Sequence, residues 1–159
     1  MSGEGKMRVL VLCHGNLNRS PFVAALIRRW RPRWTVTSAG LKTTPGRRAS
    51  RKAREAALSR GMDLGDHLSM PLTKGMVDFN DVILYMDGGN EKRLRVFLAE
   101  RYTELHASQA WVEKCRLLAG YGSLRRVPDP NYTSDPEKLR EYFGIAETCT
   151  MKFLEAHPA

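Results

Sequence analysis

The sequence lacks the features of a membrane-spanning or secreted protein. Its longest apolar runs, Val9–Cys13 and Val82–Met86, are the size of β-strands, whereas a membrane-spanning helix needs roughly 18 apolar residues. The first seven residues contain no apolar core of the kind that a signal peptide requires. The only cysteines are Cys13, Cys115 and Cys149, and an odd, widely spaced set favours a reducing compartment over a disulfide framework. We therefore expect a cytoplasmic protein with no membrane segment.

Acidic residues are scarce in the first third of the chain. No Asp or Glu lies between Glu4 and Glu55, whereas 13 of the 26 Lys and Arg residues lie in that interval. The net charge is +9, and a positive field attracts nucleic acid, an anionic surface or a phosphorylated substrate. Charge alone gives equal weight to a solvated basic face that binds no ligand.

Nucleotide-binding and metal-binding motifs are also missing. The sequence contains neither G-x-x-x-x-G-K-[ST] nor G-x-G-x-x-G, the two glycine-rich loops that cradle nucleotide phosphates. Its four histidines are scattered, with no H-E-x-x-H or C-x-x-C spacing. We therefore expect no metal ion and no cofactor.

Short apolar runs alternate with helical patterns along the chain. The runs predict strands at Met7–Cys13, Trp34–Ser38, Asp81–Met86 and Cys115–Leu118. This alternation predicts one α/β domain over residues 7–157 after a tail at residues 1–6, with a four-stranded parallel sheet and helices on both faces. Residues 103–113 fit neither pattern. Ligands of such sheets bind at the carboxyl ends of the strands, so the loop after the first strand is the first place to expect chemistry.

Residues that favour helix N-termini indicate where several helices begin. Ser20 is expected to cap the first helix, with Pro21 at its first position. Asn90 is expected to cap a helix that ends near Arg101. Ser134, three residues before a glutamate, gives a capping-box pattern for the last helix.

The loop after the first predicted strand combines a thiol with groups that bind anions. It consists of Cys13, His14, Gly15, Asn16, Leu17, Asn18 and Arg19. Main-chain N–H groups in such a turn point into a concavity, and the following helix N-terminus adds partial positive charge. Gly15 and Asn16 tolerate the left-handed backbone that a tight curl needs, and Arg19 can hold two phosphate oxygens with its planar fork. The same positive field favours the nucleophilic thiolate of Cys13.

Five motifs resemble the low-molecular-weight protein tyrosine phosphatases, in the order in which that family carries them. They are Cys13-x-Gly15-Asn16-x-x-Arg19-Ser20-Pro21, Ser38-Ala39-Gly40, Asp66-His67 with Leu72-Thr73, Val82–Met86 with Asp87 and Asn90, and Val127-Pro128-Asp129-Pro130 with Tyr132. The resemblance extends along almost the whole chain. It implies a phosphomonoester hydrolase that works through a phosphocysteine and has the phosphotyrosine phosphatase I-like fold.

The resemblance also implies a role for individual residues. Cys13 would attack phosphorus, Arg19 would stabilise the transferring phosphoryl group, and Asp129 would protonate the leaving group and later activate water. The phosphate would lie in the loop formed by residues 14–19, where sulfate or vanadate should also bind. The loop would be supported by Ser20, Ser38 and His67, and the pocket wall would be formed by Leu17, Asn131 and Tyr132.

Two departures from the family pattern affect what the site is expected to do. Many members carry a second cysteine just before the loop arginine, which can form a protective disulfide with the nucleophile. This chain has Asn18 there, so we expect no such disulfide. Asn131 stands where the family carries its first tyrosine after Asp-Pro, and Leu41–Arg48 contains no aromatic residue. The basic stretch Arg47–Arg54 could instead favour an acidic phosphoprotein or another phosphomonoester.

Two other functions remain open at this point. One branch of this fold reduces arsenate, but it needs further cysteines after the third strand, and Tyr85–Asn90 has none. A module that binds phosphate groups or nucleic acid without turnover would also use the basic first third. The presence of Cys13, Arg19 and Asp129 together favours an enzyme, so nucleic acid is the disfavoured partner. The expected partner is a phosphotyrosyl protein or a small phosphomonoester.

Overall fold

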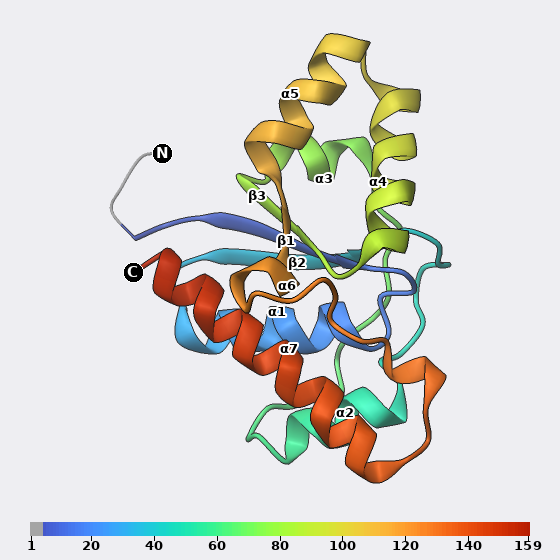
Figure 1. Cartoon of the computed structure of the whole chain (residues 1–159), viewed down its shortest axis with the longest axis vertical. Coiled ribbons are helices and arrows are strands. Elements are labelled where there is room, and N and C mark those ends of the chain that lie inside the picture. Colours follow the sequence, from blue (N-terminus) through green and yellow to red (C-terminus); the bar gives the residue numbers. More distant parts are fainter. Residues whose placement is uncertain (1–4) are drawn as a thin grey trace.

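A four-stranded sheet forms the centre of the computed structural model, which describes residues 5–159 (Figure 1). Its strands are β1 (Arg8–Cys13), β2 (Thr35–Gly40), β3 (Val82–Tyr85) and β4 (Cys115–Leu117). They lie in the order β2-β1-β3-β4, and every pairing is parallel. The predicted parallel α/β sheet is therefore confirmed. The predicted tail at residues 1–6 lies mostly outside the described residues.

Helices cover both faces of the sheet, as predicted. They are α1 (Arg19–Trp30), α2 (Arg51–Leu58), α3 (Lys74–Phe79), α4 (Gly88–Arg101), α5 (Glu104–Lys114), α6 (Leu118–Tyr121), the 3-10 turn η1 (Pro130–Tyr132) and α7 (Pro136–Ala156). In Figure 1, α1, α2 and α7 lie on one side of the sheet, and α3, α4 and α5 lie on the other. No helix among residues 5–159 is long and apolar enough to cross a membrane.

The central strand β1 is apolar from Val9 to Cys13 because this part is covered on both faces. Val9, Val11 and Cys13 belong to a buried cluster with α1 and α7, whereas Leu10 and Leu12 belong to a second cluster with α3, α4 and α5. Successive side chains of a strand point to opposite faces, so a strand between two helical layers needs apolar residues at every position. Cys13, the last residue of β1, lies on the α1 side.

Three of the predicted helix caps are wrong. Helix α1 begins at Arg19, so Ser20 lies inside the helix, where its hydroxyl group contacts Cys13. Helix α4 is capped by Asp87 rather than by Asn90, whose side chain accepts a hydrogen bond from Met86 N instead. In both helices the polar side chain that was expected at the cap makes another contact instead.

The last helix and the segment at 103–113 also differ from expectation. Asp135 caps α7, because its side chain accepts a hydrogen bond from Glu137 N, and Ser134 does not serve as the cap. Residues 103–113, which fitted no pattern, form most of α5, with Thr103 as its cap. Ala110 is the one buried residue of helix α5, so the apolar periodicity of this helix is weak.

The carboxyl ends of β1, β2 and β3 meet at one edge of the sheet, on the right in Figure 1. Two loops and one acidic residue follow the strands at this edge. They are the Cys13 loop (residues 13–19) after β1, the basic loop (residues 41–50) after β2, and Asp87 after β3. The Asp129 loop (residues 127–133) reaches the same edge, since Val127 N donates to the Met86 carbonyl. The predicted position of the site at this edge is therefore where the candidate residues meet.

Candidate active site

The Cys13 loop is curled by one left-handed residue. Asn16 has a φ of 57°, whereas Gly15 does not have a positive φ, so Asn16 alone confirms the predicted left-handed position. Among residues 5–159, no hydrogen bond is donated by the main-chain N–H groups of residues 14–18. Cys13 is 3% exposed at the end of β1. The loop therefore offers a series of main-chain donors next to a buried thiol.

Polar side chains inside the loop hold this curl in place. The Asn16 amide donates to Ser20 Oγ at 2.8 Å and to Ser38 Oγ at 3.0 Å, and Asn16 Oδ1 accepts from Met70 N at 2.9 Å. Ser20 Oγ lies 3.0 Å from Cys13 Sγ. Because Asn16 accepts and donates at once while fully buried, these contacts fix the loop relative to β2 and to the nucleophile candidate.

His67 supports the loop from outside. Its Nε2 lies 2.7 Å from the Asn16 carbonyl oxygen. Burial lowers the pKa of His67, with a further lowering from the nearby Arg28 charge, although the hydrogen bond to Asn16 acts in the opposite direction. The neutral ring is thus favoured at neutral pH, where it donates its Nε2 proton to the Asn16 carbonyl oxygen.

Gly40 lets the Cys13 loop approach β2 closely. It pairs in register with Cys13, and a Cβ atom at this position would lie 3.1 Å from the Asn16 Cβ and 3.1 Å from the Gly15 carbonyl carbon. Thr43 Cγ2 would lie closer still, at 2.7 Å, so a side chain at residue 40 would force the surrounding loops to shift. The Ser38-Ala39-Gly40 motif therefore has a packing explanation in this chain.

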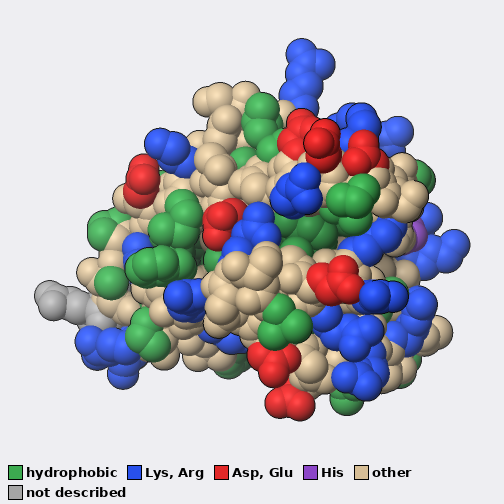
Figure 2. Space-filling view, turned by 90° about the horizontal axis from the view of Figure 1, so that it is seen from below, with side chains coloured by type: hydrophobic (Ala, Val, Ile, Leu, Met, Phe, Trp, Pro, Cys, Tyr) green, Lys and Arg blue, Asp and Glu red, His purple; other side chains and the backbone are tan. Residues whose placement is uncertain are grey.

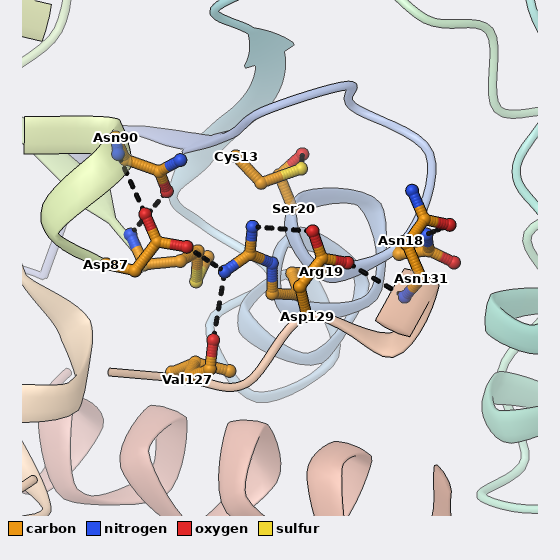
Figure 3. Close-up of polar contacts among 10 residues, drawn as sticks. Cys13, Asn18, Arg19, Ser20, Asp87, Asn90, Val127, Asp129 and Asn131 are labelled. Carbon is orange, nitrogen blue, oxygen red and sulfur yellow. Dashed lines mark hydrogen bonds and ion pairs between the residues drawn. The ribbon is translucent and has the colours of Figure 1, made fainter. Parts of the chain in front are cut away.

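Arg19 is a buried cation held by three acceptors (Figure 3). Its Nη1 donates to Asp87 Oδ2 at 2.6 Å and to the Val127 carbonyl oxygen at 2.9 Å, and its Nη2 lies 3.4 Å from Asp129 Oδ2. Burial tends to raise the pKa of Asp87, but hydrogen bonds from Arg19 and from main-chain N–H groups outweigh burial and lower it. An ionised Asp87 therefore holds Nη1 of the guanidinium group and leaves Nη2 facing Asp129.

Asp129 lies opposite Asp87 across the Arg19 guanidinium group (Figure 3). Its backbone is extended, with φ −85° and ψ 118°, as expected for a residue before proline. Asp129 Oδ1 accepts from Asn131 N at 2.9 Å, which leaves Oδ2 facing Arg19. A carboxyl group thus lies within a few ångströms of the same cation that borders the thiol.

Asn18 connects the Cys13 loop to two neighbouring segments. Its Nδ2 donates to Asn131 Oδ1 at 3.1 Å, and its Oδ1 accepts from the hydroxyl group of Ser50 at the start of α2. Lys52 links these two neighbouring segments to each other, because its Nζ, on α2, donates to the Pro130 and Thr133 carbonyl oxygens of the Asp129 loop. The two positions at which the chain departs from the family pattern, 18 and 131, therefore contact each other.

A cavity of about 490 Å³ brings most of the predicted site residues together. It is lined by Cys13, His14, Gly15, Leu17, Asn18, Arg19, Lys42, Arg47, Arg48, Ser50, Asp129 and Asn131. Tyr132 is not part of this lining and is 87% exposed, so its assignment to the pocket wall stays a prediction. No group of three or more potential metal ligands is found among residues 5–159.

Sequence reasoning assigned no site role to several of the residues gathered here. Asp87 was part of a matched motif only, although an acid directly after a parallel strand is a signal for the ligand-binding edge. Lys42 and Ser50 gave no signal, because their positions depend on how the basic loop folds back. The predicted basic stretch at 47–54 is divided: Arg47 and Arg48 line the cavity, whereas Arg51 pairs with Glu55 on the solvent side.

Comparisons with known proteins agree with this geometry. EpsP of Ralstonia nicotianae, named "Probable low molecular weight protein-tyrosine-phosphatase", is 37% identical over 87 residues, which are 55% of this chain and 60% of EpsP. The matched part therefore spans less than two thirds of EpsP. The crystal structure of the tyrosine phosphatase AmsI from Erwinia amylovora superimposes with a TM-score of 0.79 at 27% identity, covering 94% of this chain and 91% of AmsI.

A second solved structure carries a different substrate in its name. The YwlE arginine phosphatase from Geobacillus stearothermophilus has a TM-score of 0.77 and 26% identity, with coverage of 94% of this chain and 92% of YwlE. The family described as "Low molecular weight phosphotyrosine protein phosphatase" matches residues 8–157, which confirms the resemblance found in the motifs. The chain belongs to the low molecular weight phosphotyrosine protein phosphatase family.

Proposed function

We propose that this chain hydrolyses phosphomonoesters, with phosphotyrosine in proteins as the substrate, through a phosphocysteine on Cys13. The observation that supports this most directly is that the Cys13 thiol, the Arg19 guanidinium group and the Asp129 carboxyl group border one cavity of about 490 Å³. Nucleophile, charge-stabilising group and proton donor are the three parts that phosphoryl transfer through a covalent intermediate needs.

In the first step the Cys13 thiolate attacks phosphorus. An S–P bond forms as the bond between phosphorus and the tyrosine oxygen breaks, and Asp129 gives its proton to the leaving oxygen. The negative charge on the phosphoryl oxygens is stabilised by Arg19 and by the main-chain donors of residues 14–18, which are already oriented before the reaction. The Ser20 hydroxyl group, 3.0 Å from Cys13 Sγ, donates to the thiolate.

In the second step water hydrolyses the phosphocysteine. The Asp129 carboxylate takes a proton from water as the water oxygen bonds to phosphorus, and the S–P bond breaks with its electrons returning to sulfur. Inorganic phosphate leaves, and the site regains a thiolate and a protonated carboxyl group. Asp129 thus acts as an acid in the first step and as a base in the second.

Phosphotyrosine is favoured over phosphoarginine by the charge of the cavity lining. Lys42, Arg47 and Arg48 line the cavity, so the guanidinium group of phosphoarginine, the substrate in the name of YwlE, would meet like charges. Phosphate release from matched phosphotyrosyl and phosphoarginyl proteins separates the two substrates. Faster release from the phosphoarginyl protein would contradict the proposal.

Turnover of a simple aryl phosphate tests the proposed reaction itself. Wild type should release phosphate from p-nitrophenyl phosphate, vanadate and sulfate should inhibit it, and Cys13→Ser should be inactive. Equal inactivity of wild type and Cys13→Ser would favour a phosphate-binding module, and arsenate reduction without phosphate release would favour the reductase. We place the protein in the cytoplasm, because a reducing compartment keeps Cys13 available as a thiol.

A further inference from the structure

The basic loop places three cationic side chains on the cavity that contains Cys13. Lys42, Arg47 and Arg48 are exposed and line this cavity. Figure 2 shows Lys and Arg side chains gathered on its right-hand side, the side toward which the strands run in Figure 1. The lining contains one carboxyl group, that of Asp129. The cavity is therefore strongly positive beyond the loop that would hold the phosphate.

None of these three charges is neutralised by an ion pair within residues 5–159. Their neighbours in the same basic stretch behave differently. Arg51 pairs with Glu55, and Lys52 donates to two carbonyl oxygens of the Asp129 loop. The charges of Lys42, Arg47 and Arg48 therefore remain available to an anion in the cavity.

The main chain of the basic loop is tied to its surroundings at both ends. Lys42 N donates to the His14 carbonyl oxygen at 2.8 Å, and Ser50 N donates to the Leu17 carbonyl oxygen at 2.9 Å. In its middle, Arg47 N donates to Ser69 Oγ and Ser69 N donates to the Arg47 carbonyl oxygen. Ser69 is 1% exposed. The backbone that carries the three cations is therefore held beside the Cys13 loop.

The cavity offers little to an aromatic ring apart from Leu17. No Phe, Tyr or Trp lines it, and Leu17 is the one large aliphatic side chain of the lining. Packing between aromatic rings stabilises a bound ring beyond the area that it buries, and no residue of the lining supplies such packing. Selectivity must therefore come mainly from charge.

We propose that Lys42, Arg47 and Arg48 form a subsite for a second anionic group of the substrate, namely Asp or Glu side chains that flank the phosphotyrosine in an acidic protein segment. This inference rests on the proposed function, since it assumes that the phosphoryl group lies against Cys13. A peptide fits better than a small phosphomonoester with a second anionic group, because the exposed guanidinium groups can reach an extended chain that leaves the cavity.

Hydrolysis of three phosphotyrosyl peptides tests the subsite. The peptides share one length and carry acidic, neutral or basic residues around the phosphotyrosine. At low salt, wild type should favour the acidic over the neutral peptide by about tenfold in kcat/KM, which corresponds to one or two charge pairs at the protein surface. This ratio should fall in high salt, because ions screen exposed charges. Equal rates for acidic and neutral peptides would overturn the proposal.

Variants assign the preference to particular side chains. In Arg47→Ala/Arg48→Ala the ratio between acidic and neutral peptides should fall close to one. The matched control, Arg33→Ala/Lys152→Ala, removes two exposed cations, one before β2 and one on α7, that do not line the cavity, and it should keep the wild-type ratio. A preference that survives in the first variant, or that the control loses equally, would contradict the assignment.

Two further arms separate the possible sources of failure. A carboxyphenyl phosphate compared with phenyl phosphate tests a small substrate that carries a second anionic group. A preference found only for the carboxyphenyl phosphate, and not for the acidic peptide, would contradict an acidic protein segment as the occupant of the subsite. Binding of the same peptides to Cys13→Ser protein tests the subsite without turnover. Preferential binding of the acidic peptide by a wild type that releases no phosphate would keep the subsite and reject the proposed hydrolysis.

Discussion

Asp87 Oδ2 accepts a hydrogen bond from Arg19 Nη1 at 2.6 Å, while Asp87 Oδ1 accepts from Asn90 N at 2.8 Å. One carboxylate therefore orients the guanidinium group of the Cys13 loop and caps helix α4. This contact joins the loops after β1 and β3, which the sheet brings to the same edge. It also gives a guanidinium group that is 3% exposed a charged partner and a fixed direction.

Asp87→Asn should separate the two roles of this carboxylate. Asparagine keeps the cap but removes the charge opposite Arg19, so we expect about a tenfold or larger loss of kcat for aryl phosphate hydrolysis through misplacement of Arg19. At pH 7 the free energy of unfolding should fall by about 1.5–3 kcal/mol, the range for a hydrogen bond to a charged group. Urea unfolding checks this, and Glu55→Gln, in an exposed pair, should change little.

The stability difference between wild type and Asp87→Asn should depend on pH. Because the folded state lowers the pKa of Asp87, its contribution is fully present above the unfolded value of about 3.9. The contribution is lost as the pH falls through the lower folded pKa. The difference should therefore be largest near neutral pH and narrow in acid. A difference that grows in acid would contradict the ion pair.

Protonation of His67 should lower the free energy of unfolding as the pH falls. Its folded pKa lies below the unfolded value of about 6.5, so the unfolded chain binds a proton first. The free energy of unfolding should decrease as the pH falls from about 6.5 toward the folded pKa, and His67→Gln should lack this component. An NMR titration of the ring measures the pKa directly, and a midpoint above 6.5 would refute the neutral donor to Asn16.

Much of the fold was predictable because its strands are short apolar runs separated by polar turns. The sheet, the buried faces of β1 and the ligand-binding edge follow from periodicity and from the geometry of parallel sheets. The helix starts were less predictable, because Ser20 and Asn90 have competing partners in Cys13 and in Met86 N. Sequence spacing cannot choose between a cap and such a tertiary contact.

The site was predictable where residues lie in one loop and less so where the fold joins distant segments. Cys13, Asn16 and Arg19 lie within seven residues, and their chemistry follows from their spacing. The contact of Asn18 with Asn131 spans 113 positions, and the place of Lys42 depends on the anchoring of the basic loop. Such contacts are set by tertiary packing, which leaves no periodic signal in the sequence.

The Asn18–Asn131 contact should couple the Cys13 loop to the Asp129 loop during turnover. Asn18→Ala and Asn131→Ala should each lower kcat several-fold, because each releases the Asp129 loop on one side. In a double-mutant cycle their effects should be less than additive, with a coupling of about 0.5–1.5 kcal/mol. Fully additive effects would show that the hydrogen bond at 3.1 Å does not position Asp129.

Peroxide should inactivate the protein irreversibly by oxidising Cys13. Cys115 pairs with Ile83, and Ile83 pairs with Leu10, so Cys115 lies two strands across and three residues along from Cys13. This offset corresponds to about 14 Å between Cα atoms, whereas a disulfide needs Cα atoms less than about 7 Å apart. Burial raises the pKa of Cys115 to about 12 and also raises that of Cys149, so both should remain unreactive thiols.

Asn18→Cys provides the matched variant for this prediction. A cysteine at position 18 should form a disulfide with Cys13 and make the inactivation reversible by thiols. Mass spectrometry after mild peroxide distinguishes the outcomes in both proteins. A Cys13–Cys115 or Cys13–Cys149 disulfide in wild type would contradict the structural argument.

The most direct test of the account is to locate the phosphoryl group during turnover. In Asp129→Ala, p-nitrophenyl phosphate should still react at the first step because its leaving group needs little protonation, while the second step loses its base. Rapid quenching followed by mass spectrometry should then find one phosphoryl group on the peptide that contains Cys13. Turnover with an unmodified Cys13, or a phosphoryl group on another residue, would contradict the central claim.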